Sequence, residues 1–332
     1  MLPLVVTMGE PAGIGGEITL KAWLGRAGGV PQFYLIDDPD RVAALARRLG
    51  WPVPVRPIST PAAALEIFAE ALPVMPVGVN LKAPAGRPDP ANTPAVLGAI
   101  ETAVCDVRAG RAAALVTNPI HKGSLYRAGF RYPGHTEYLA ALAGATETPI
   151  MMLVCQTLRV VPVTIHLALR QAIQQLSSSA IVHAGRVTEA GLREYFGVAA
   201  PRLAIAGLNP HAGEGGALGC EEIDIIEPAI SELRAAGIDT RGPLAADTMF
   251  YAAARRDYDA ALCMYHDQAL IPIKTIDFHG GVNVTLGLPF VRTSPDHGTA
   301  FAIAGRGVAR ADSLIAALRL AADMAAKRVA AH

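Results

Sequence analysis

The amino-acid sequence predicts an α/β protein in which helices cover both faces of a mostly parallel sheet. Apolar runs of strand length, such as residues 2–8, alternate along the chain with helical patterns, such as residues 40–49 and 91–110. The last of these patterns has Pro94 near its start and Gly110 after its end, which are typical helix start and stop signals. No internal repeat or low-complexity linker interrupts this alternation.

Composition and charge exclude several classes of protein. The 332 residues are enough for two domains or one large one. Basic and acidic residues balance at 29 each, so we expect no sequence-independent binding of nucleic acid. No apolar run approaches the roughly 18 residues of a membrane helix, and we expect no signal peptide. The four cysteines lack metal-binding spacing and indicate free thiols in a cytoplasmic enzyme: Cys105, Cys155, Cys220 and Cys263.

The segment GEPAGIGGE joins the first predicted strand to a helix that begins near Ile18. A strand, a glycine turn and a helix in this order outline a phosphate-binding turn. However, Gly9 and Gly13 are too far apart for the GxGxxG fingerprint, and the GK[ST] of a P-loop is absent. The spacing therefore favours a tight turn that holds the helix to the sheet.

Three histidines occupy equivalent places, each at or just past the end of an apolar strand: His166, His211 and His266. The carboxyl ends of parallel strands lie on one side of a sheet, so the three imidazoles could converge there. Three imidazoles with an open position are typical of a catalytic divalent metal site. Asp247 and Asp267 are candidates to orient them, because ligating imidazoles usually donate their second N–H. The alternative is three separate histidines that stabilise turns.

The densest polar stretch, residues 264–305, carries Lys274, Asn283 and Arg292, which follow His266 at successive intervals of eight to nine residues. We expect strand and turn here rather than a long helix. Together with His135 and Thr136, which begin a predicted helix upstream, these side chains suit a carboxylate or phosphate. The alternative for Lys274 and Arg292 is an ordinary solvated surface.

A polar loop follows in the segment SPDHGTAFAIAG, and it contains Asp296, His297, Gly298 and Thr299. The residues alone assign no purpose to this turn.

The order of several motifs resembles the 4-hydroxythreonine-4-phosphate dehydrogenase (PdxA) family, the NAD-dependent enzymes of pyridoxal phosphate biosynthesis. The resemblance covers residue 4 to about residue 312, and its motifs include TMGEPAGIGGE, VTNPIHK, YPGHTEYLA, LNPHAGEGGALGCEE, YHDQALIPIK and GGVNVTLGLPFVRTSPDHGTAF. The loop SPDHGTAFAIAG also resembles the nucleotide-binding loop of the isocitrate and isopropylmalate dehydrogenases.

The resemblance implies two α/β/α domains with the active site in the cleft between them. One discontinuous domain would comprise residues 1–125 and 275–332 and carry the nucleotide-binding loop. The other would comprise residues 126–274 and carry the metal ligands and the contacts of a homodimer whose active sites lie at the subunit interface.

The resemblance also implies a role for each group of candidate residues. The metal ligands would be His166, His211 and His266, and NAD would bind at Asp296, His297, Gly298 and Thr299. The substrate would contact His135, Thr136, Lys274, Asn283 and Arg292. The catalytic candidates are Lys274, Asp247 and Asp267, with the proton acceptor left open between Lys274 and a water linked to an aspartate.

The implied reaction is oxidation of 4-phosphohydroxy-L-threonine to a β-keto acid that loses CO₂. Several alternatives stay open. The metal could be Zn²⁺, Co²⁺ or Mg²⁺, and Ala302, where many relatives have an acidic residue, leaves NADP possible. Related enzymes oxidise 4-phosphoerythronate- or phosphothreonate-type acids or aromatic cis-dihydrodiols. A metal- or phosphate-sensing protein is the rival outside enzymes, and the nucleotide-type loop argues against it.

Overall fold

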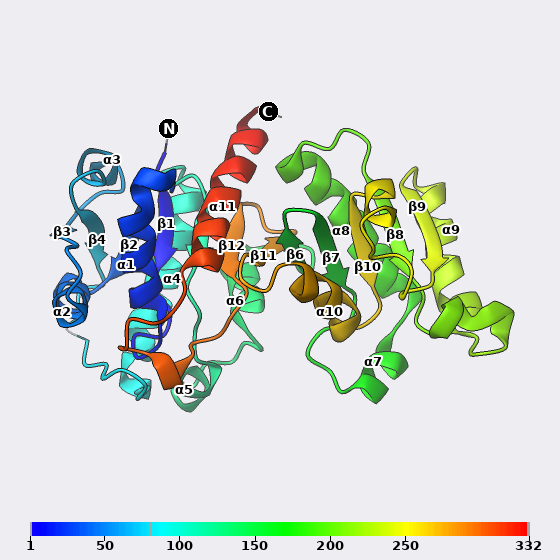
Figure 1. Cartoon of the computed structure of the whole chain (residues 1–332), viewed down its shortest axis with the longest axis horizontal. Helices are drawn as coiled ribbons and strands as arrows, with labels where there is room; N and C mark the ends of the chain where they lie inside the picture. Colours follow the sequence, from blue (N-terminus) through cyan, green and yellow to red (C-terminus); the bar gives the residue numbers. More distant parts are fainter. Residues whose placement is uncertain (1, 80, 331–332) are drawn as a thin grey trace. The chain divides into compact units, whose positions relative to one another are not determined.

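A computed structural model describes residues 2–79 and 81–330 of the chain, which divides into two compact units (Figure 1). The first unit comprises Met1–Pro149 and Leu288–Ala326, and the second comprises Ile150–Gly287 and Lys327–His332. Both units are discontinuous in sequence, and their boundaries fall further along the chain than the expected ones after residues 125 and 274. The α/β class predicted from the sequence is confirmed in each unit.

The first unit is built on a parallel sheet. Its strand order is β3 (Val55–Pro57), β4 (Leu72–Pro76), β2 (Phe33–Asp37), β1 (Leu4–Thr7), β5 (Leu115–Thr117) and β12 (Arg292–Pro295). Every neighbouring pair in this order is parallel. β12 arrives from the far end of the sequence and pairs Arg292 with Leu115. This pairing places the end of the chain beside its first half.

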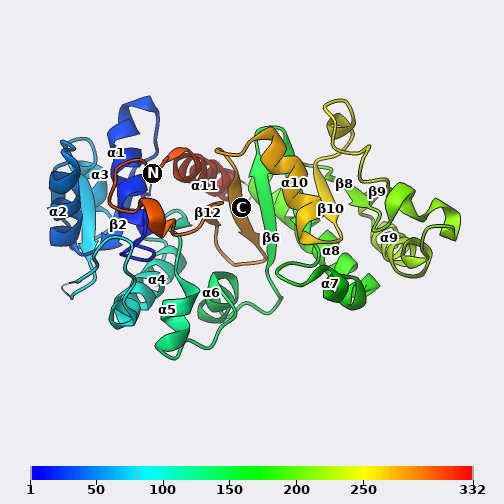
Figure 2. The same ribbon diagram turned by 60° about the horizontal axis from the view of Figure 1, so that its bottom comes forward.

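Helices cover both faces of this sheet. They are α1 (Gly15–Leu24), α2 (Pro39–Leu49), α3 (Ala63–Ile67), α4 (Thr93–Arg108), α5 (Lys122–Arg127), α6 (His135–Ala143) and α11 (Asp312–Ala330). Figures 1 and 2 show α1 and α11 on one face and α4 and α6 on the other. Ala99 and Ile100 of α4 pack with Val5 and Leu115 of the sheet in one buried cluster. The strand and helix patterns of the sequence therefore share one apolar core.

The second unit contains a mixed sheet. Its strand order is β11 (Val282–Leu286), β6 (Ile150–Cys155), β7 (Leu158–Pro162), β10 (Ala260–Cys263), β8 (Arg202–Ala206) and β9 (Asp239–Leu244). β6 pairs antiparallel with both β11 and β7, whereas β7, β10, β8 and β9 are parallel to one another. β6 and β7 form a hairpin, and the parallel strands lead to the three candidate histidines at their ends.

The helices of the second unit are α7 (Leu169–Gln175), α8 (Ser178–Phe196), α9 (Glu227–Ala235) and α10 (His266–Ile276). α10 covers one face of the sheet and α8 and α9 cover the other (Figures 1 and 2). A Cβ on Gly185 of α8 would lie 2.7 Å from a methyl group of Leu233 on α9, so glycine permits this close packing. α7 and α8 are separate helices, because Leu176 is extended and Ser177 caps α8.

The expectation of strand and turn after residue 264 is wrong at α10, which runs for eleven residues. Ala269 and Ile273 lie four residues apart and both bury against the sheet, which is helical spacing. This packing maintains the helix although Pro272 lies inside it. Among the described residues, no helix is long and apolar enough to cross a membrane.

Candidate functional site

Arg292 is the centre of a polar cluster in the first unit. It begins β12, its exposed fraction is 4%, and its Nη2 donates a hydrogen bond of 2.7 Å to Thr117 Oγ1 at the end of β5. Burial lowers the pKa of Arg292 to about 10, which leaves the guanidinium charged at neutral pH. A buried cation of this kind is stable where an anionic group can approach it.

His135 lies beside this charge at the first position of α6. Its Nε2 is buried and has no hydrogen-bond partner among the described residues. Burial, and then the charges of Arg292 and Lys122, lower the pKa of His135 well below its usual value. The imidazole is therefore neutral at pH 7. Its ring, the two cations and the free N–H groups at the start of α6 suit a bound phosphate or carboxylate.

Two members of this cluster were not among the residues predicted to bind substrate. Thr117 and Lys122 come from the polar turn of VTNPIHK, where the sequence shows polar groups after a buried strand but no partner for them. Thr136 follows His135 and is half-buried, as a residue in the first turn of α6. The structure thus brings His135 and Arg292 together and adds a hydroxyl and an ammonium to them, and their binding of substrate stays a prediction.

The nucleotide-type loop packs on the glycine turn at the start of the chain. Thr299 accepts a hydrogen bond from the Ile14 N–H (3.1 Å) through its carbonyl oxygen. A Cβ on Gly13 would lie 2.9 Å from that same oxygen, so only glycine allows this approach. The Asp296 N–H donates to Ser313 Oγ (2.9 Å), and His297 Nδ1 lies 3.1 Å from the Gly298 carbonyl oxygen. The tight turn favoured by the glycine spacing is confirmed, and it supports the loop.

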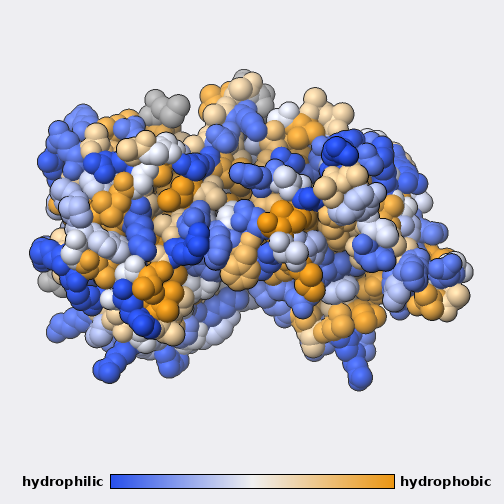
Figure 3. Space-filling model, viewed as in Figure 1, coloured by the Kyte–Doolittle hydropathy of each residue, from blue (hydrophilic) through white to orange (hydrophobic). Residues whose placement is uncertain are grey.

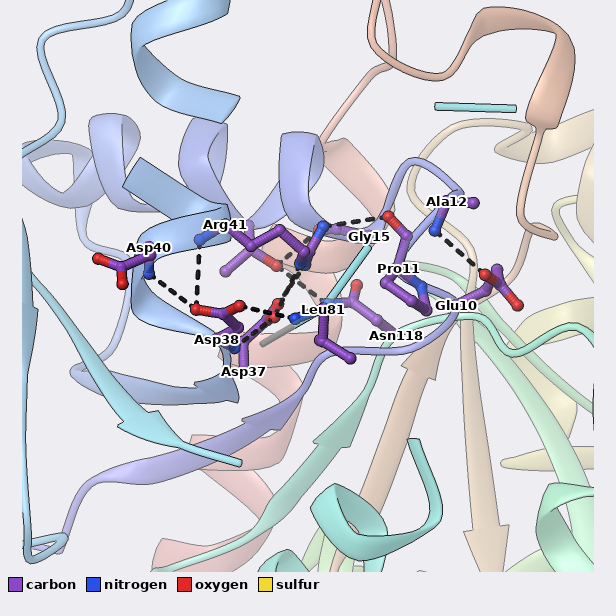
Figure 4. A network of polar contacts seen from close by, with 11 residues as sticks. Glu10, Pro11, Ala12, Gly15, Asp37, Asp38, Asp40, Arg41, Leu81 and Asn118 are labelled. Atoms are coloured by element: carbon purple, nitrogen blue, oxygen red, sulfur yellow. Dashed lines mark hydrogen bonds and ion pairs between the residues drawn. The ribbon is translucent and has the colours of Figure 1, made fainter. Parts of the chain in front are cut away.

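Figure 4 shows why the end of β2 does not act as a dinucleotide fingerprint. Such sites use a carboxylate at this position to bind a ribose. Here both oxygens of Asp37 accept from the Arg41 guanidinium, whose Nη1 also donates to the Pro11 carbonyl oxygen (3.0 Å). Asp38 caps α2 by accepting from the Asp40 N–H (2.9 Å). Both carboxylates therefore already accept hydrogen bonds from groups of the same chain.

Two of the three candidate histidines meet in the second unit. His266 begins α10 directly after β10, and His166 follows β7, the parallel neighbour of β10. The centroids of the two rings are 5.8 Å apart. His266 Nδ1 lies 2.7 Å from an Asp267 carboxylate oxygen, which orients the ring and leaves Nε2 to bind a ligand. Imidazole nitrogen is a donor type that divalent metals such as Zn²⁺ accept in proteins.

His211 is not joined to this pair within one chain. It lies on the exposed turn after β8, and the described part of the chain contains no group of three or more His, Cys, Asp or Glu side chains able to hold a metal ion. The predicted convergence of three imidazoles is therefore realised for His166 and His266 only.

The other predicted residues lie on separate elements of the second unit. Asn283 is on β11, and its Oδ1 is buried without a hydrogen-bond partner among the described residues. Lys274 is in the last turn of α10, with Nζ 5.4 Å from the Phe278 ring centroid. Asp247 is exposed in the turn after β9. Their roles in substrate binding and catalysis stay predictions.

These features define a protein of two α/β units, one with a polar cluster around buried Arg292 and the other with a histidine pair in which His266 contacts a carboxylate. The sequence profile of the pyridoxal phosphate biosynthetic protein PdxA matches residues 30–321. A 4-hydroxythreonine-4-phosphate dehydrogenase of Bradyrhizobium diazoefficiens is 56% identical over 338 residues, with 98% of each chain covered. The chain belongs to the PdxA family, whose relatives carry the name of a dehydrogenase.

Solved structures agree with this assignment. The 4-hydroxythreonine-4-phosphate dehydrogenase of Klebsiella pneumoniae superimposes with a TM-score of 0.87 at 36% identity, covering 98% of this chain and 100% of that one. A terephthalate 1,2-cis-dihydrodiol dehydrogenase of Burkholderia xenovorans LB400 superimposes with a TM-score of 0.64 at 28% identity, covering 97% and 98%. The same scaffold is thus shared with an enzyme named for a substrate of another class.

Proposed function

We propose that this chain is a 4-hydroxythreonine-4-phosphate dehydrogenase that acts in pyridoxal phosphate biosynthesis. The observation that carries this choice of substrate is the cluster of Arg292, Lys122 and neutral His135, because a phosphate requires concentrated positive charge and N–H donors. The identity of more than half with relatives of that name supports the same choice.

The reaction would oxidise the C3 hydroxyl of 4-phosphohydroxy-L-threonine. The products are 2-amino-3-oxo-4-phosphooxybutanoate, a hydride on the nicotinamide, and a proton. The β-keto acid then loses CO₂ and gives 3-amino-2-oxopropyl phosphate, because the ketone accepts the electrons of the breaking bond. When bound, NAD⁺ accepts the hydride, and a divalent metal lowers the pKa of the hydroxyl.

The side chains would divide these tasks. Arg292 and His135, with Thr136, hold an anionic end of the substrate, and Lys274 and Asn283 contribute further polar contacts to it. His166, His211 and His266 are the proposed metal ligands, and the histidine donor set fits Zn²⁺ or Co²⁺, with Mg²⁺ as an alternative. Asp267 keeps the His266 ring in its ligating orientation. For the proton acceptor, we keep Lys274 and a water held by Asp247 or Asp267.

The loop of Asp296, His297, Gly298 and Thr299 is the proposed NAD site. Its support on the glycine turn at Gly13 favours a fixed backbone there, which a nucleotide-binding loop needs. Ala302 adds no acidic group near this loop, so NADP is the alternative cofactor. The balanced charge and free cysteines fit the cytoplasm as the compartment.

A homodimer would complete the metal site. Exposed apolar side chains follow each candidate histidine in the sequence: Leu167, Leu169 and Ile173; Leu218 and Ile223; Ile271, Ile276 and Phe278. Figure 3 shows such side chains at the surface over α7 and α10. Phe278 alone is 68% exposed, which is costly unless a partner covers it. We infer that a second copy packs here and supplies the His211 that the pair lacks.

The second candidate is a dehydrogenase of aromatic dicarboxylate cis-dihydrodiols, favoured by the terephthalate enzyme of Burkholderia xenovorans LB400 at a TM-score of 0.64. Acids of the 4-phosphoerythronate or phosphothreonate type remain rivals that keep the phosphate. The lower identity of 28% ranks the dihydrodiol behind the phosphorylated amino acid.

The test is NADH formation at 340 nm with each of these substrates, on chelator-treated protein with and without added Zn²⁺, Co²⁺ or Mg²⁺. We expect metal-dependent turnover with 4-phosphohydroxy-L-threonine and none with the dihydrodiol. Turnover of the dihydrodiol alone would overturn the proposed substrate.

A further inference from the structure

The turn that carries His211 has an unusual backbone. His211, Ala212 and Glu214 adopt φ of 53°, 52° and 45°, and the glycines between and after them are also left-handed. A non-glycine residue in this region is strained, because its Cβ approaches the following carbonyl oxygen too closely. Three such residues in one short turn persist only where surrounding contacts hold the chain in place.

The carboxylate of Glu222 provides those contacts from inside the turn. Its exposed fraction is 2%, and its Oε1 accepts from the N–H groups of Leu208 and Asn209 at 2.7 Å each. Its Oε2 accepts from Asn209 Nδ2 at 2.8 Å. A Cβ on Gly213 would lie 2.7 Å from the same Oε2, so the turn closes tightly around this carboxylate. No role in binding or chemistry is otherwise attached to Glu222.

Gln268 extends this support to the other two histidines. It is buried on α10, two residues after His266. Its Nε2 donates to the Gly207 carbonyl oxygen, at the entrance to the His211 turn, at 2.7 Å. Its Oε1 accepts from the Met264 N–H at 2.6 Å. One side chain therefore links the strand ends that lead to His211 and His266.

The link continues to His166 through Thr164. Thr164 Oγ1 donates at 2.8 Å to the carbonyl oxygen of Met264, the residue whose N–H is bound by Gln268. Thr164 precedes His166 by two residues, and Met264 precedes His266 by two. A chain of buried hydrogen bonds thus connects all three segments that carry the proposed ligands.

We propose that Glu222 and Gln268 are positioning residues that hold the three histidine-bearing segments for metal binding. This inference rests on the proposed metal-dependent function. Neither side chain contacts the metal. Each acts by fixing backbone groups, and groups that orient metal ligands typically contribute 10–100-fold to metal affinity, as an order of magnitude.

The test measures Co²⁺ binding to the full-length protein by its visible absorption, with Zn²⁺ affinity measured by chelator competition. The variants are Glu222→Gln and Gln268→Glu, which keep size and shape but each remove a hydrogen bond of this network. The matched control is Glu221→Gln, a neighbouring carboxylate that accepts from Asn209 Nδ2 (2.7 Å) and from the backbone N–H groups of Cys220 and Glu221, whereas Glu222 accepts from those of Leu208 and Asn209. Circular dichroism checks that each variant is folded.

We expect both variants to bind metal roughly 10–100-fold more weakly with an altered Co²⁺ spectrum, and the control to bind within about threefold of wild type. Adding both Asn209→Asp and Glu221→Gln to Glu222→Gln gives the new carboxylate an amide donor on each side and should recover part of the affinity, which a general loss of stability would not do. If the Glu222→Gln and Gln268→Glu proteins are folded and keep the wild-type metal affinity and spectrum, this inference is wrong, but the proposed metal site still stands. A wild-type protein that binds no Co²⁺ would instead overturn the proposed metal site and this inference with it.

Discussion

The two units differ in the burial and the contacts of their candidate site residues. In the first unit Arg292 is buried and bound to Thr117, and the neighbouring His135 imidazole is held neutral, with its buried Nε2 lacking a hydrogen-bond partner among the described residues. In the second unit His166 and His211 are exposed, and two of the three histidines approach each other. If the proposed roles hold, the contrast teaches that the groups for a charged end of the substrate come together within one chain, whereas the proposed metal site needs a ligand beyond the pair of His166 and His266.

The largest expected effect comes from removing a proposed metal ligand. His266→Ala leaves at most two imidazoles at the site, so we expect turnover to fall roughly a thousandfold and added metal not to restore it. His279→Ala, an exposed histidine beyond the same helix, is the control and should match wild type. The measurement is NADH formation at saturating metal. Turnover of the His266 variant near the wild-type rate would contradict the proposed role of a bound metal in the reaction.

The substitution Arg292→Lys tests whether the cluster of Arg292 and His135 binds the phosphate of the substrate. A lysine keeps the charge but loses the planar, two-point contact, so kcat/KM should fall roughly 100-fold, mainly through KM. The same variant should show a much smaller loss with dephosphorylated substrate. The exposed Arg310→Lys is the control. An equal loss for both substrates would assign Arg292 to the carboxylate instead.

Asp267→Asn asks how strongly the carboxylate orients His266. The amide no longer stabilises the ring in the form that exposes Nε2, so metal affinity should fall roughly tenfold while the substrate KM at saturating metal stays unchanged. Metal titration of wild type, Asp267→Asn and the exposed control Asp257→Asn measures this effect. Unchanged affinity would make the contact incidental.

The smallest effect concerns the pH dependence of stability. The pKa of His135 is below its unfolded value near 6.5, so the unfolded chain takes up a proton first as the pH falls. The stability contributed by the neutral form is complete above that pH and is lost below it, by at most about 1.4 kcal/mol per pH unit. His135→Asn should therefore show a weaker loss of stability between pH 6.5 and pH 5.5 in denaturant unfolding. Equal slopes for both proteins would place His135 in contact with water.

Local sequence patterns predicted most of the helices and strands. They did not predict which residues far apart in the sequence contact each other. The ends of β7 and β10 could be located from apolar runs, and their parallel pairing accounts for the meeting of His166 and His266. The Thr117 partner of Arg292 is 175 residues away, and nothing in either segment signals the pairing.

Two further features, α10 and the turn at His211, were not predicted, and each has a local cause. α10 was not predicted because Pro272 and the glycines that follow the helix, Gly280 and Gly281, are typical of strand and turn, while its core contacts come from tertiary packing. The left-handed turn at His211 was not predicted because His, Ala and Glu adopt positive φ only when groups such as Glu222 hold them.

The most direct test of the account is complementation between variants in mixed dimers, purified through two different tags on co-expressed chains. If His166 and His266 of one chain join His211 of the other, a dimer of His211→Ala with His266→Ala contains one intact site. It should show about half of wild-type turnover, and so should His211→Ala with His166→Ala. A dimer of His166→Ala with His266→Ala contains no intact site and should be inactive. Activity restored in this last dimer, or in none of the three, would contradict the division of the metal site between copies of the chain.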